Sequence, residues 1–380
     1  MANVPVTCAS IFASRQEALD VPAGDVNLVA CDACGFVFNR SFDAALGAIS
    51  ARYESSQAAS AHFGAFARSL ARDWIERHNL LGRTVLEVGC GGADFLRLLL
   101  SEGVGTGIGI DPCCDPRAPG GQSNMHLIAD VFDARALHLH ADALVCRHTI
   151  EHICDVRGFL LLLRGWALRN PGAVLLFELP ASERIFAEHA FWDVYYEHCN
   201  YFTERTIRLA FEIAGFEVRR AERVYDGQYL IVEASAVTPV RLVTPSDTSA
   251  AVAECRAFGT QVNQAIERCR ERLRRLTQGE NAGAPLVLWQ GASKTVGFLS
   301  GVGAAMIDSA VDLSPQRQGR FLPGSGLPVH APAELTRLRP RHIILMNAVY
   351  LREVQAQVQA LGVPCRVHAV NDLLAETFVP

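Results

Sequence analysis

The sequence lacks the features that bring a chain to a membrane or to a nucleic acid. No apolar run reaches the ~18 residues needed to cross a bilayer. The first residues have neither a charged lead nor a long apolar core, so a signal peptide is not expected. The formal net charge is -5, and the one basic run, residues 270–275, is typical of a solvated helix face. We therefore expect neither a membrane nor a nucleic acid as a partner.

A disulfide framework is also missing. The 12 cysteines are scattered and lie mostly in apolar segments, so reduced thiols in the cytoplasm are the expected state. A complete set of metal-binding cysteines is absent as well, because structural zinc normally takes four ligands. Cys31 and Cys34 form a Cys-x-x-Cys turn, and Cys8 is the one thiol upstream. These thiols predict either a small hairpin without metal or a zinc site completed elsewhere.

What the chain does contain is a repeated alternation of strand and helix patterns. Its 380 residues, of which 50% are hydrophobic, are enough for two or three domains. Strands that alternate with helices indicate parallel sheets covered on both faces, and hence an α/β fold. The pattern divides the chain into a cysteine-containing segment, an α/β core, a helical connector and a smaller α/β domain. Their residues are 1–56, 57–245, 246–284 and 285–380.

The expected elements follow from hydrophobic period and from glycine and proline stops. In the core, helices are predicted over 57–80, 93–102, 156–168 and 203–214, and strands over 84–88, 105–110, 125–128, 143–147 and 173–178. A closing antiparallel pair is predicted over 216–220 and 229–234. The connector is one long helix over 248–278. The last part has strands over 286–290, 307–312, 342–346 and 365–368, and helices over 294–300 and 351–361.

The most informative motif is a glycine turn between a strand and a helix. It contains Glu87, Gly89 and Gly91, and Asp111 follows Gly91 by 20 residues. Glycines let the backbone approach a ligand closely, and an acid at that distance can hold both hydroxyls of a ribose. The last glycine of a full dinucleotide fingerprint is replaced by Asp94, and Glu87 would repel a pyrophosphate. The motif therefore favours an adenosyl group with a cationic sulfur and an amino-acid tail.

A second turn of this kind, Gly291-Ala292-Ser293-Lys294, opens the C-terminal alternation. Backbone N–H groups at such a turn attract anions, and Lys294 would add charge for a nucleotide diphosphate. Asp312 follows Gly291 by 21 residues, which imitates a ribose-binding acid, although the packing of any α/β domain gives the same spacing. Further candidate phosphate partners are Arg317, Arg320 and His330.

With these segments in order, the chain resembles the class I S-adenosylmethionine-dependent methyltransferases, and more narrowly the three-domain sugar C-methyltransferases. The segments that carry the resemblance are Cys31-x-x-Cys34-Gly35, Tyr53-Glu54-Ser55-Ser56, Glu87-x-Gly89-x-Gly91, Arg147-His148-Thr149-Ile150-Glu151-His152-Ile153, Tyr195-Tyr196-Glu197-His198, Lys294, and Gln318-Gly319-Arg320-Phe321-Leu322-Pro323-Gly324. The implied fold is a Rossmann-like methyltransferase core with a zinc-binding N-terminal segment and a second, smaller α/β domain.

The chain departs from this family in three places. The zinc set is incomplete. A glycine-rich segment of the family reads here Asp226-Gly227-Gln228-Tyr229-Leu230, with Gln and Tyr in place of Gly and Ser. The turn before Lys294 is only an approximate match. These departures bear on the acceptor more than on the fold.

The resemblance implies a binding site for S-adenosylmethionine. The methionine half would contact Glu87, Gly89 and Gly91, and Asp111 would hold the ribose. Asp130 lies where the superfamily contacts adenine, with an ordinary strand-end aspartate as the alternative. The remaining candidate at the cofactor is His148, which follows a strand on the ligand side of the sheet; a packed or capping histidine is its alternative.

The resemblance also implies methylation at carbon on a nucleotide-linked keto-deoxysugar. A carbon beside a ketone needs a base to remove its proton and a donor to stabilise the enolate oxygen. His198 is the candidate base because imidazole titrates near neutrality; by spacing alone it would be a surface histidine on an amphipathic turn. With the resemblance, Glu197, Tyr195 and Tyr53 are expected to orient the base, donate to the oxygen or hold the sugar. Lys294 and Arg320 are expected at the substrate, and Cys8, Cys31 and Cys34 at a structural zinc.

Two other functions stay open at this point. An O- or N-methyltransferase on a sugar or small metabolite would need only positioning and a weak base. A cofactor-binding protein without transfer activity would use the two α/β domains as a recognition scaffold. The intact set of Glu87, Gly89, Gly91 and Asp111 argues against loss of the cofactor site.

Overall fold

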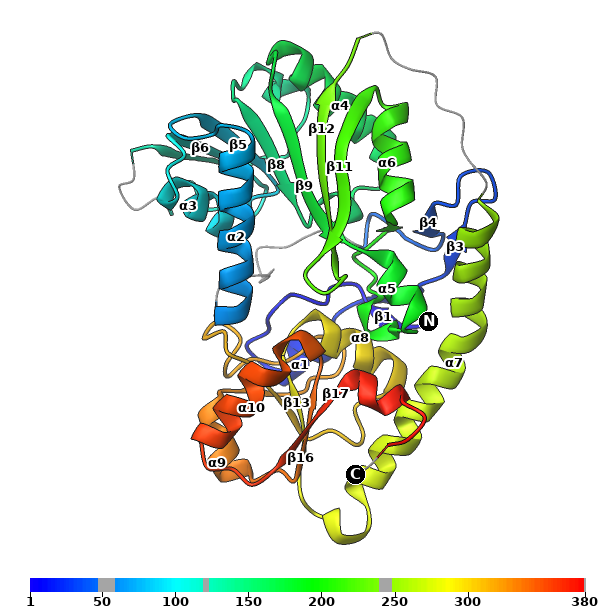
Figure 1. Ribbon diagram of the computed structural model, residues 1–380. Coiled ribbons are helices and arrows are strands. Elements are labelled where there is room, and N and C mark those ends of the chain that lie inside the picture. Colours follow the sequence, from blue (N-terminus) through cyan, green and yellow to red (C-terminus); the bar gives the residue numbers. More distant parts are fainter. Residues whose placement is uncertain (47–58, 119–122, 239–247, 379–380) are drawn as a thin grey trace.

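The fold is organised around two sheets, which lie one above the other in Figure 1. The computed structural model describes residues 1–46, 59–118, 123–238 and 248–378. Helix α7 (Ser249–Thr277) runs down one side of the molecule and passes beside the lower sheet (Figure 1). The single long helix predicted over 248–278 is thereby confirmed.

The larger sheet has seven strands in the order β11-β12-β9-β8-β5-β6-β7. Strands β5 to β9 are parallel, whereas β12 is antiparallel to both of its neighbours. Their bounds are β5 Thr84–Val88, β6 Thr106–Ile110, β7 Met125–Ile128, β8 Ala143–Arg147, β9 Val174–Pro180, β11 Phe216–Val224 and β12 Tyr229–Ala236. The predicted strands and the closing antiparallel pair are confirmed, because this buried sheet shows its pattern strongly in sequence.

Helices cover both faces of this sheet, because successive strand residues point to opposite sides. Val85 packs with the helices on one face, and Leu86 with those on the other. The first face carries α2 (Ala61–Arg77) and α3 (Asp94–Ser101), and the second carries α4 (Val156–Arg169) and α6 (Glu204–Ile213). The four helices predicted for the core are confirmed, with ends shifted by a few residues.

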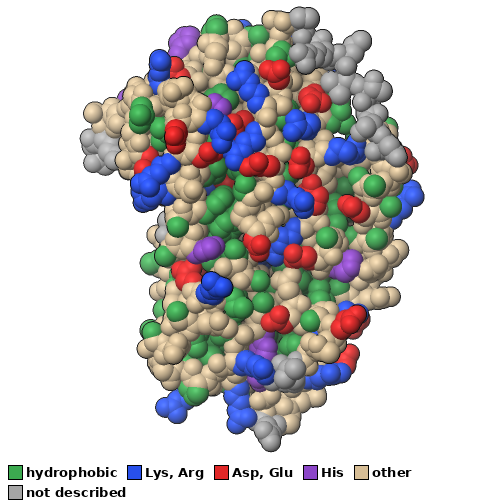
Figure 2. Space-filling view, in the orientation of Figure 1, with side chains coloured by type: hydrophobic (Ala, Val, Ile, Leu, Met, Phe, Trp, Pro, Cys, Tyr) green, Lys and Arg blue, Asp and Glu red, His purple; other side chains and the backbone are tan. Residues whose placement is uncertain are grey.

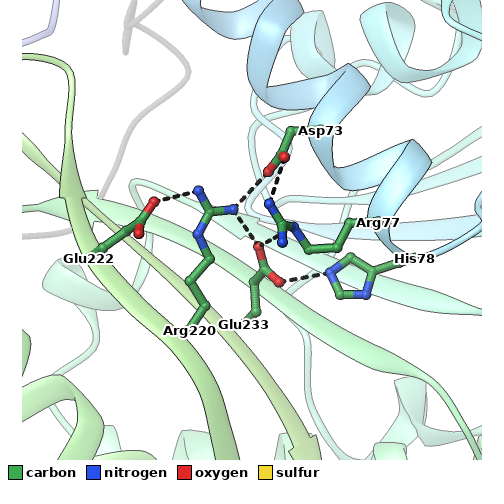
Figure 3. A network of polar contacts seen from close by, with 6 residues as sticks. All are labelled: Asp73, Arg77, His78, Arg220, Glu222 and Glu233. Atoms are coloured by element: carbon green, nitrogen blue, oxygen red, sulfur yellow. Dashed lines mark hydrogen bonds and ion pairs between the residues drawn. The ribbon is translucent and has the colours of Figure 1, made fainter.

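A polar network ties α2 to the β11–β12 hairpin (Figure 3). The Arg220 guanidinium lies 2.7 Å from Asp73 and 2.8 Å from the buried carboxylate of Glu233. His78, at the end of α2, is 2.9 Å from the other oxygen of Glu233. These contacts fix the helix that borders the site described below.

The smaller sheet has five parallel strands in the order β15-β14-β13-β16-β17. Its strands are β13 Leu286–Trp289, β14 Ser309–Val311, β15 Val329–His330, β16 His342–Leu345 and β17 Arg366–Ala369, and its helices are α8 Ser293–Val302, α9 Leu335–Leu338 and α10 Leu351–Ala360. The predicted elements are confirmed. Strand β15 and helix α9 were not predicted, because so few residues show no period.

The N-terminal segment packs against the segment that follows His198. Strands β3 (Leu28–Ala30) and β4 (Val37–Asn39) form a hairpin around the Cys-x-x-Cys turn, and β10 (Asn200–Tyr201) extends it. The other short elements here are β1 Val4–Pro5, β2 Ala23–Gly24, α1 Arg15–Leu19 and α5 Ser182–Ala187. The 3-10 turns of the chain are η1 Ala134–His138, η2 Ile150–His152, η3 Phe191–Asp193, η4 Gly279–Asn281, η5 Pro332–Glu334, η6 Ala348–Tyr350 and η7 Val370–Leu374.

The surface carries mixed charge. On the face drawn in Figure 2, arginines and acidic side chains are interspersed rather than gathered by sign. Within the described ranges, no helix is both long and apolar enough to span a bilayer.

Candidate active site

A cavity of about 1100 Å³ lies between the carboxyl ends of the two sheets. Its lining residues follow β5, β6, β7, β8 and β9 of the larger sheet and β13, β14 and β16 of the smaller one. Strand order reverses between β5 and β8 in the first sheet, and between β13 and β16 in the second. Open α/β sheets bind ligands at such reversals, so the cavity joins the natural ligand sites of both sheets.

The glycine turn after β5 shapes the first half of the cavity. Gly89 and Gly91 take φ angles of 73° and 49°, which favour glycine. A Cβ on Gly89 would collide with Thr149, whereas one on Gly91 would meet nothing within 4 Å. The Gly91 N–H donates to one oxygen of Asp111 at 2.9 Å, and the Cys113 N–H donates to the other at 2.7 Å. The turn therefore leaves open space and holds the acid beside it.

Glu87 is a buried acid that suits a cationic ligand. Its residue is 2% exposed, and within the described part of the chain its Oε2 has no hydrogen-bond partner. Burial raises the pKa of Glu87 to about 8, although Arg147 opposes the rise. An unpaired buried carboxyl group is costly, and a ligand ammonium would compensate it. The donor set of Glu87, Gly91 and Asp111 therefore fits the amino-acid tail and ribose of S-adenosylmethionine.

Asp130 lies at the rim of this half. Its carboxylate accepts from the Val131 N–H at 2.8 Å and pairs with Arg135 at 3.0 Å. The side chain is 42% exposed, and the residue lines the cavity with Val131 and Phe132. This neighbourhood is compatible with an adenine base.

His148 lines the cavity as a charged group. Its Nε2 is 3.2 Å from Glu178 and its Nδ1 is 3.7 Å from Glu151. Burial alone would lower the pKa of His148, but the neighbouring carboxylates of Glu151 and Glu178 raise it to about 9. Burial likewise opposes the ionisation of Glu178, yet Arg147 and His148 lower its pKa to about 2. A histidine held between two carboxylates supplies charge and position rather than a free base.

His198 has the opposite environment. It is enclosed by the rings of Tyr195 and His152, with centroids 4.8 Å and 4.9 Å away. Burial, assisted by the neighbouring His152, lowers the pKa of His198 to about 3, so the imidazole is neutral at pH 7. The side chain is half-buried, so it does not stand on an open surface as spacing alone suggested. Both His198 and Tyr195 line the cavity.

Sequence reasoning missed two partners of His198. Glu151, His152 and His198 each bring one polar atom to within 4.8 Å of the other two. Glu151 is 2% exposed, and neither of its oxygens has a hydrogen bond within the described residues. Both missed residues lie in the segment 147–153 that carried the resemblance, which was the available signal. The cluster places a carboxylate beside the candidate base.

Glu197 faces away from the cavity and is not among its lining residues. Its carboxylate accepts from the Thr7 hydroxyl at 2.8 Å and from the N–H of Cys8 at 2.9 Å, and it also bonds the Cys8 thiol. Its carbonyl oxygen lies 2.9 Å from His152 Nδ1. Glu197 therefore connects the N-terminal segment to the cluster of Glu151, His152 and His198.

The three candidate zinc ligands do not come together. Cys8 is buried against Glu197, whereas Cys31 and Cys34 lie on the β3–β4 hairpin. Among the described residues, these two thiols have no third histidine, cysteine or acid close enough to share an ion. The residues present there do not form a structural zinc site.

The remaining candidates divide between the cavity and its surroundings. Lys294 and Arg317 line the cavity, whereas Arg320 and His330 are not among its lining residues. Tyr53 lies outside the described residues. The basic wall of the second half is therefore Lys294 and Arg317.

The turn after β13 repeats the geometry of the turn after β5. The Gly291 N–H donates to one oxygen of Asp312 at 2.8 Å, and the Ser314 N–H donates to the other at 2.8 Å. Gln290 takes a φ of 101°, in the left-handed region that Gly89 occupies in the first turn. The cavity thus has two similar turns, one from each sheet.

Known protein families match both α/β parts of the chain. A methyltransferase domain model matches residues 63–221, and a C-methyltransferase C-terminal domain model matches residues 233–363. C-methyltransferase NovU of Streptomyces niveus is 26% identical over 305 residues, which are 76% of this chain and 72% of that protein.

Solved structures are similar to part of the chain. Magnesium protoporphyrin IX methyltransferase from Synechocystis PCC 6803, with bound SAH, has 14% identity and a TM-score of 0.36 over 46% of this chain and 84% of its own. A SAM-dependent methyltransferase from Aquifex aeolicus has 22% identity and a TM-score of 0.35 over 44% and 89%. With the two domain models and the NovU match, the chain is an S-adenosylmethionine-dependent methyltransferase that resembles the sugar C-methyltransferases.

Proposed function

We propose that this methyltransferase places a methyl group on a carbon atom of a nucleotide-linked keto-deoxysugar. The observation that carries the proposal is the shared cavity, which is lined by the glycine turn after β5, by the similar turn after β13, and by the cluster of Glu151, His152 and His198. The match to a C-methyltransferase C-terminal domain and the name of the NovU relative support the choice of carbon.

The donor occupies the half next to β5. When bound, S-adenosylmethionine supplies an electrophilic methyl group on its sulfonium. Glu87 compensates the ammonium of the amino-acid tail, Asp111 accepts from the ribose hydroxyls, and Asp130 borders the adenine. The open space over Gly91 lets the backbone approach the ligand.

The acceptor occupies the half next to β13. Asp312 stands to Gly291 as Asp111 stands to Gly91, so it is placed to accept from the ribose of the nucleotide. Arg317, with its residue 4% exposed and its guanidinium 3.1 Å from the Gly291 carbonyl, provides positive charge for the diphosphate. The sugar then extends toward His198.

His198 takes the proton from the carbon beside the ketone. The neutral imidazole has a lone pair for this proton, and Glu151, beside it, stabilises the imidazolium that forms. Burial and His152 lower the pKa of His198 to about 3 although Glu151 raises it, so the carboxylate offsets part of the cost of charging this imidazole. A positioned base of this kind contributes roughly 10²- to 10⁴-fold to a reaction rate.

The direct test is methyl transfer to a panel of nucleotide-linked 4-keto-sugars, with labelled S-adenosylmethionine and location of the methyl by NMR. We expect methyl on carbon, and near-complete loss of turnover in His198→Asn. The Arg337→Met variant, at an exposed ion pair with Glu334, is the matched control. Methyl on oxygen or nitrogen, or substantial turnover by His198→Asn, would contradict the proposal.

We also propose that the segments 1–56, 57–245, 246–284 and 285–380 act as separate structural units. The two separate sheets support this division, as does the long α7, which connects them in the sequence. We further propose a cytoplasmic setting with reduced thiols, which the free cysteines of the structure allow.

A further inference from the structure

Lys294 is the only lysine in the sequence, whereas arginine occurs 34 times among the 35 basic residues. The two side chains are not interchangeable, because lysine presents a compact ammonium with three donors and arginine a broad planar fork. A chain that uses arginine at every other cationic position therefore uses an ammonium at this one. Its place in the fold indicates why.

Lys294 is the second residue of α8 and lines the cavity. Its side chain is 14% exposed, and its Nζ contacts Oδ1 of Asp193, a residue of η3 that also lines the cavity. Asp193 is itself 11% exposed and lies 3.8 Å from Arg184. Burial lowers the pKa of Lys294, while Asp193 opposes that effect and favours the charged form.

The packing of α8 on η3 sets this contact. A Cβ on Gly297 would lie 2.6 Å from the Trp192 carbonyl oxygen, so only glycine allows the helix to come so near. Phe298 stacks on Phe191 with ring centroids 5.7 Å apart. The close packing of α8 on η3 therefore holds Lys294 beside Asp193.

Asp193 links Lys294 to the candidate base. The Tyr195 hydroxyl donates to Asp193 Oδ1 at 2.9 Å, and the Tyr195 ring meets the His198 ring edge to face. The proton of Tyr195 is thus already donated to Asp193. Of these two residues bonded to Asp193 Oδ1, Lys294 is the one with N–H groups beyond the one that Asp193 engages.

We propose that Lys294, held by Asp193, donates a hydrogen bond to the keto oxygen of the sugar and stabilises the enolate that forms when His198 removes the α-proton. In this step the C–H bond breaks and its proton passes to the imidazole. The electron pair becomes the new C=C bond, and the negative charge moves to the oxygen beside the ammonium. No proton has to leave the lysine. The inference rests on the proposed function and deepens it.

Charge favours this role over diphosphate binding and over a covalent one. The carboxylate of Asp193 touches the ammonium and would repel a diphosphate placed on the same nitrogen, whereas an enolate carries one charge that forms only during the reaction. An ammonium paired with a carboxylate has no lone pair with which to attack a ketone. Preorganised donors at a developing oxyanion are typically worth about 10²- to 10³-fold in rate.

The test follows exchange of the α-proton for solvent deuterium by NMR, in a nucleotide-linked 4-keto-sugar, with S-adenosylhomocysteine in place of the methyl donor. We expect exchange with the native enzyme, and a roughly 100-fold slower exchange with Lys294→Met. The dissociation constant of the matching nucleoside diphosphate should stay unchanged, and Lys294→Arg should recover part of the rate. Arg337→Met is the matched control, and binding of S-adenosylhomocysteine reports folding.

Each result decides the inference. Unchanged exchange in Lys294→Met, or a change confined to nucleoside diphosphate affinity, overturns it while the proposed function stands. A borohydride-trapped sugar adduct on Lys294 also overturns it. Absence of exchange in the native enzyme refutes the proposed function together with the inference. If Lys294→Met does not fold, Asp193→Asn takes its place, with slower exchange as the expected result.

Discussion

At the scale of single residues, two histidines of one cavity differ because their neighbours differ. His148 lies between Glu151 and Glu178 and is held as a cation, whereas His198 lies among rings and is held neutral. Both residues were candidates from the sequence, in which an imidazole shows nothing of its surroundings. Only the tertiary contacts of each imidazole distinguish the positioning role of His148 from the proposed role of His198 as the base.

The first prediction concerns the pH dependence of stability. The pKa of His148 in the folded protein is about 9, above the value of roughly 6.5 expected for the unfolded chain. Its stabilising contribution is therefore full below about pH 6.5 and is lost as the pH rises through about 9. Thermal unfolding between about pH 6 and about pH 10 should show this loss in the native protein. His148→Gln should lack it, while His126→Gln, on an exposed site of β7, should keep it.

The second prediction concerns Glu87 and the donor. Because the pKa of Glu87 is about 8 in the empty cavity, the group is mostly protonated at pH 7, and a bound ammonium would ionise it. Binding of S-adenosylmethionine should then release close to one proton, which calorimetry in buffers of different ionisation heat can measure. Glu87→Gln should bind about tenfold or more weakly and release none. Equal proton release in both proteins would exclude this role of Glu87.

At the scale of elements, short contacts decide where the charged groups meet. Helix α8 reaches η3 because glycine occupies positions 297 and 301, where a Cβ would touch Trp192 or Phe191. The hydrophobic period of the sequence predicts the helix α8, but it does not predict the element against which α8 packs. Similarly, β10 is too short to predict and yet attaches the segment after His198 to the N-terminal hairpin.

The third prediction tests this helix contact. Gly297→Ala should force α8 away from Trp192 and lower the free energy of unfolding by about 1–3 kcal/mol. It should also slow the α-proton exchange, because Lys294 moves with the helix. Gly259→Ala in α7, where a Cβ would meet nothing within 4 Å, should gain up to about 1 kcal/mol from helix propensity. Chemical denaturation measures both, and equal effects of the two substitutions would contradict the argument.

At the scale of the whole molecule, buried polar contacts hold the two sheets around one cavity. Gln228, before β12, and Asn347, after β16, exchange two amide hydrogen bonds of 3.1 Å and 2.9 Å. Nearby, the Tyr225 hydroxyl donates to the Tyr350 hydroxyl at 2.9 Å. Gln228, one of the two residues that depart from the family pattern, thus forms part of the contact between the two α/β parts of the chain.

The fourth prediction tests this contact. Asn347→Leu leaves the buried amide of Gln228 without its partner and should cost about 1–3 kcal/mol of folding free energy. The double variant Gln228→Leu with Asn347→Leu removes both polar groups and should recover much of that loss. Urea denaturation provides the measurement. A double variant that loses the sum of both single effects would show that the two amides do not act as a pair.

Local pattern was enough to predict much of this protein. The strand at 84–88, its glycine turn and Asp111 are recognisable because backbone hydrogen bonding, glycine conformation and strand period depend on neighbouring residues. The alternation of elements likewise determined two parallel sheets, and with them the edge at which ligands bind. The resemblance added the segment 195–198 and the class of reaction.

Tertiary structure alone decided which distant groups meet. Glu197 turns to Cys8 across 189 residues, which removes Cys8 from any zinc set with Cys31 and Cys34. Asp193 meets Lys294 across 101 residues. Such contacts depend on how whole elements pack and on which charges must be compensated once water is excluded. No local sequence pattern encodes such long-range contacts. For this reason the donor site could be predicted from the sequence, whereas the arrangement of residues around the acceptor could not.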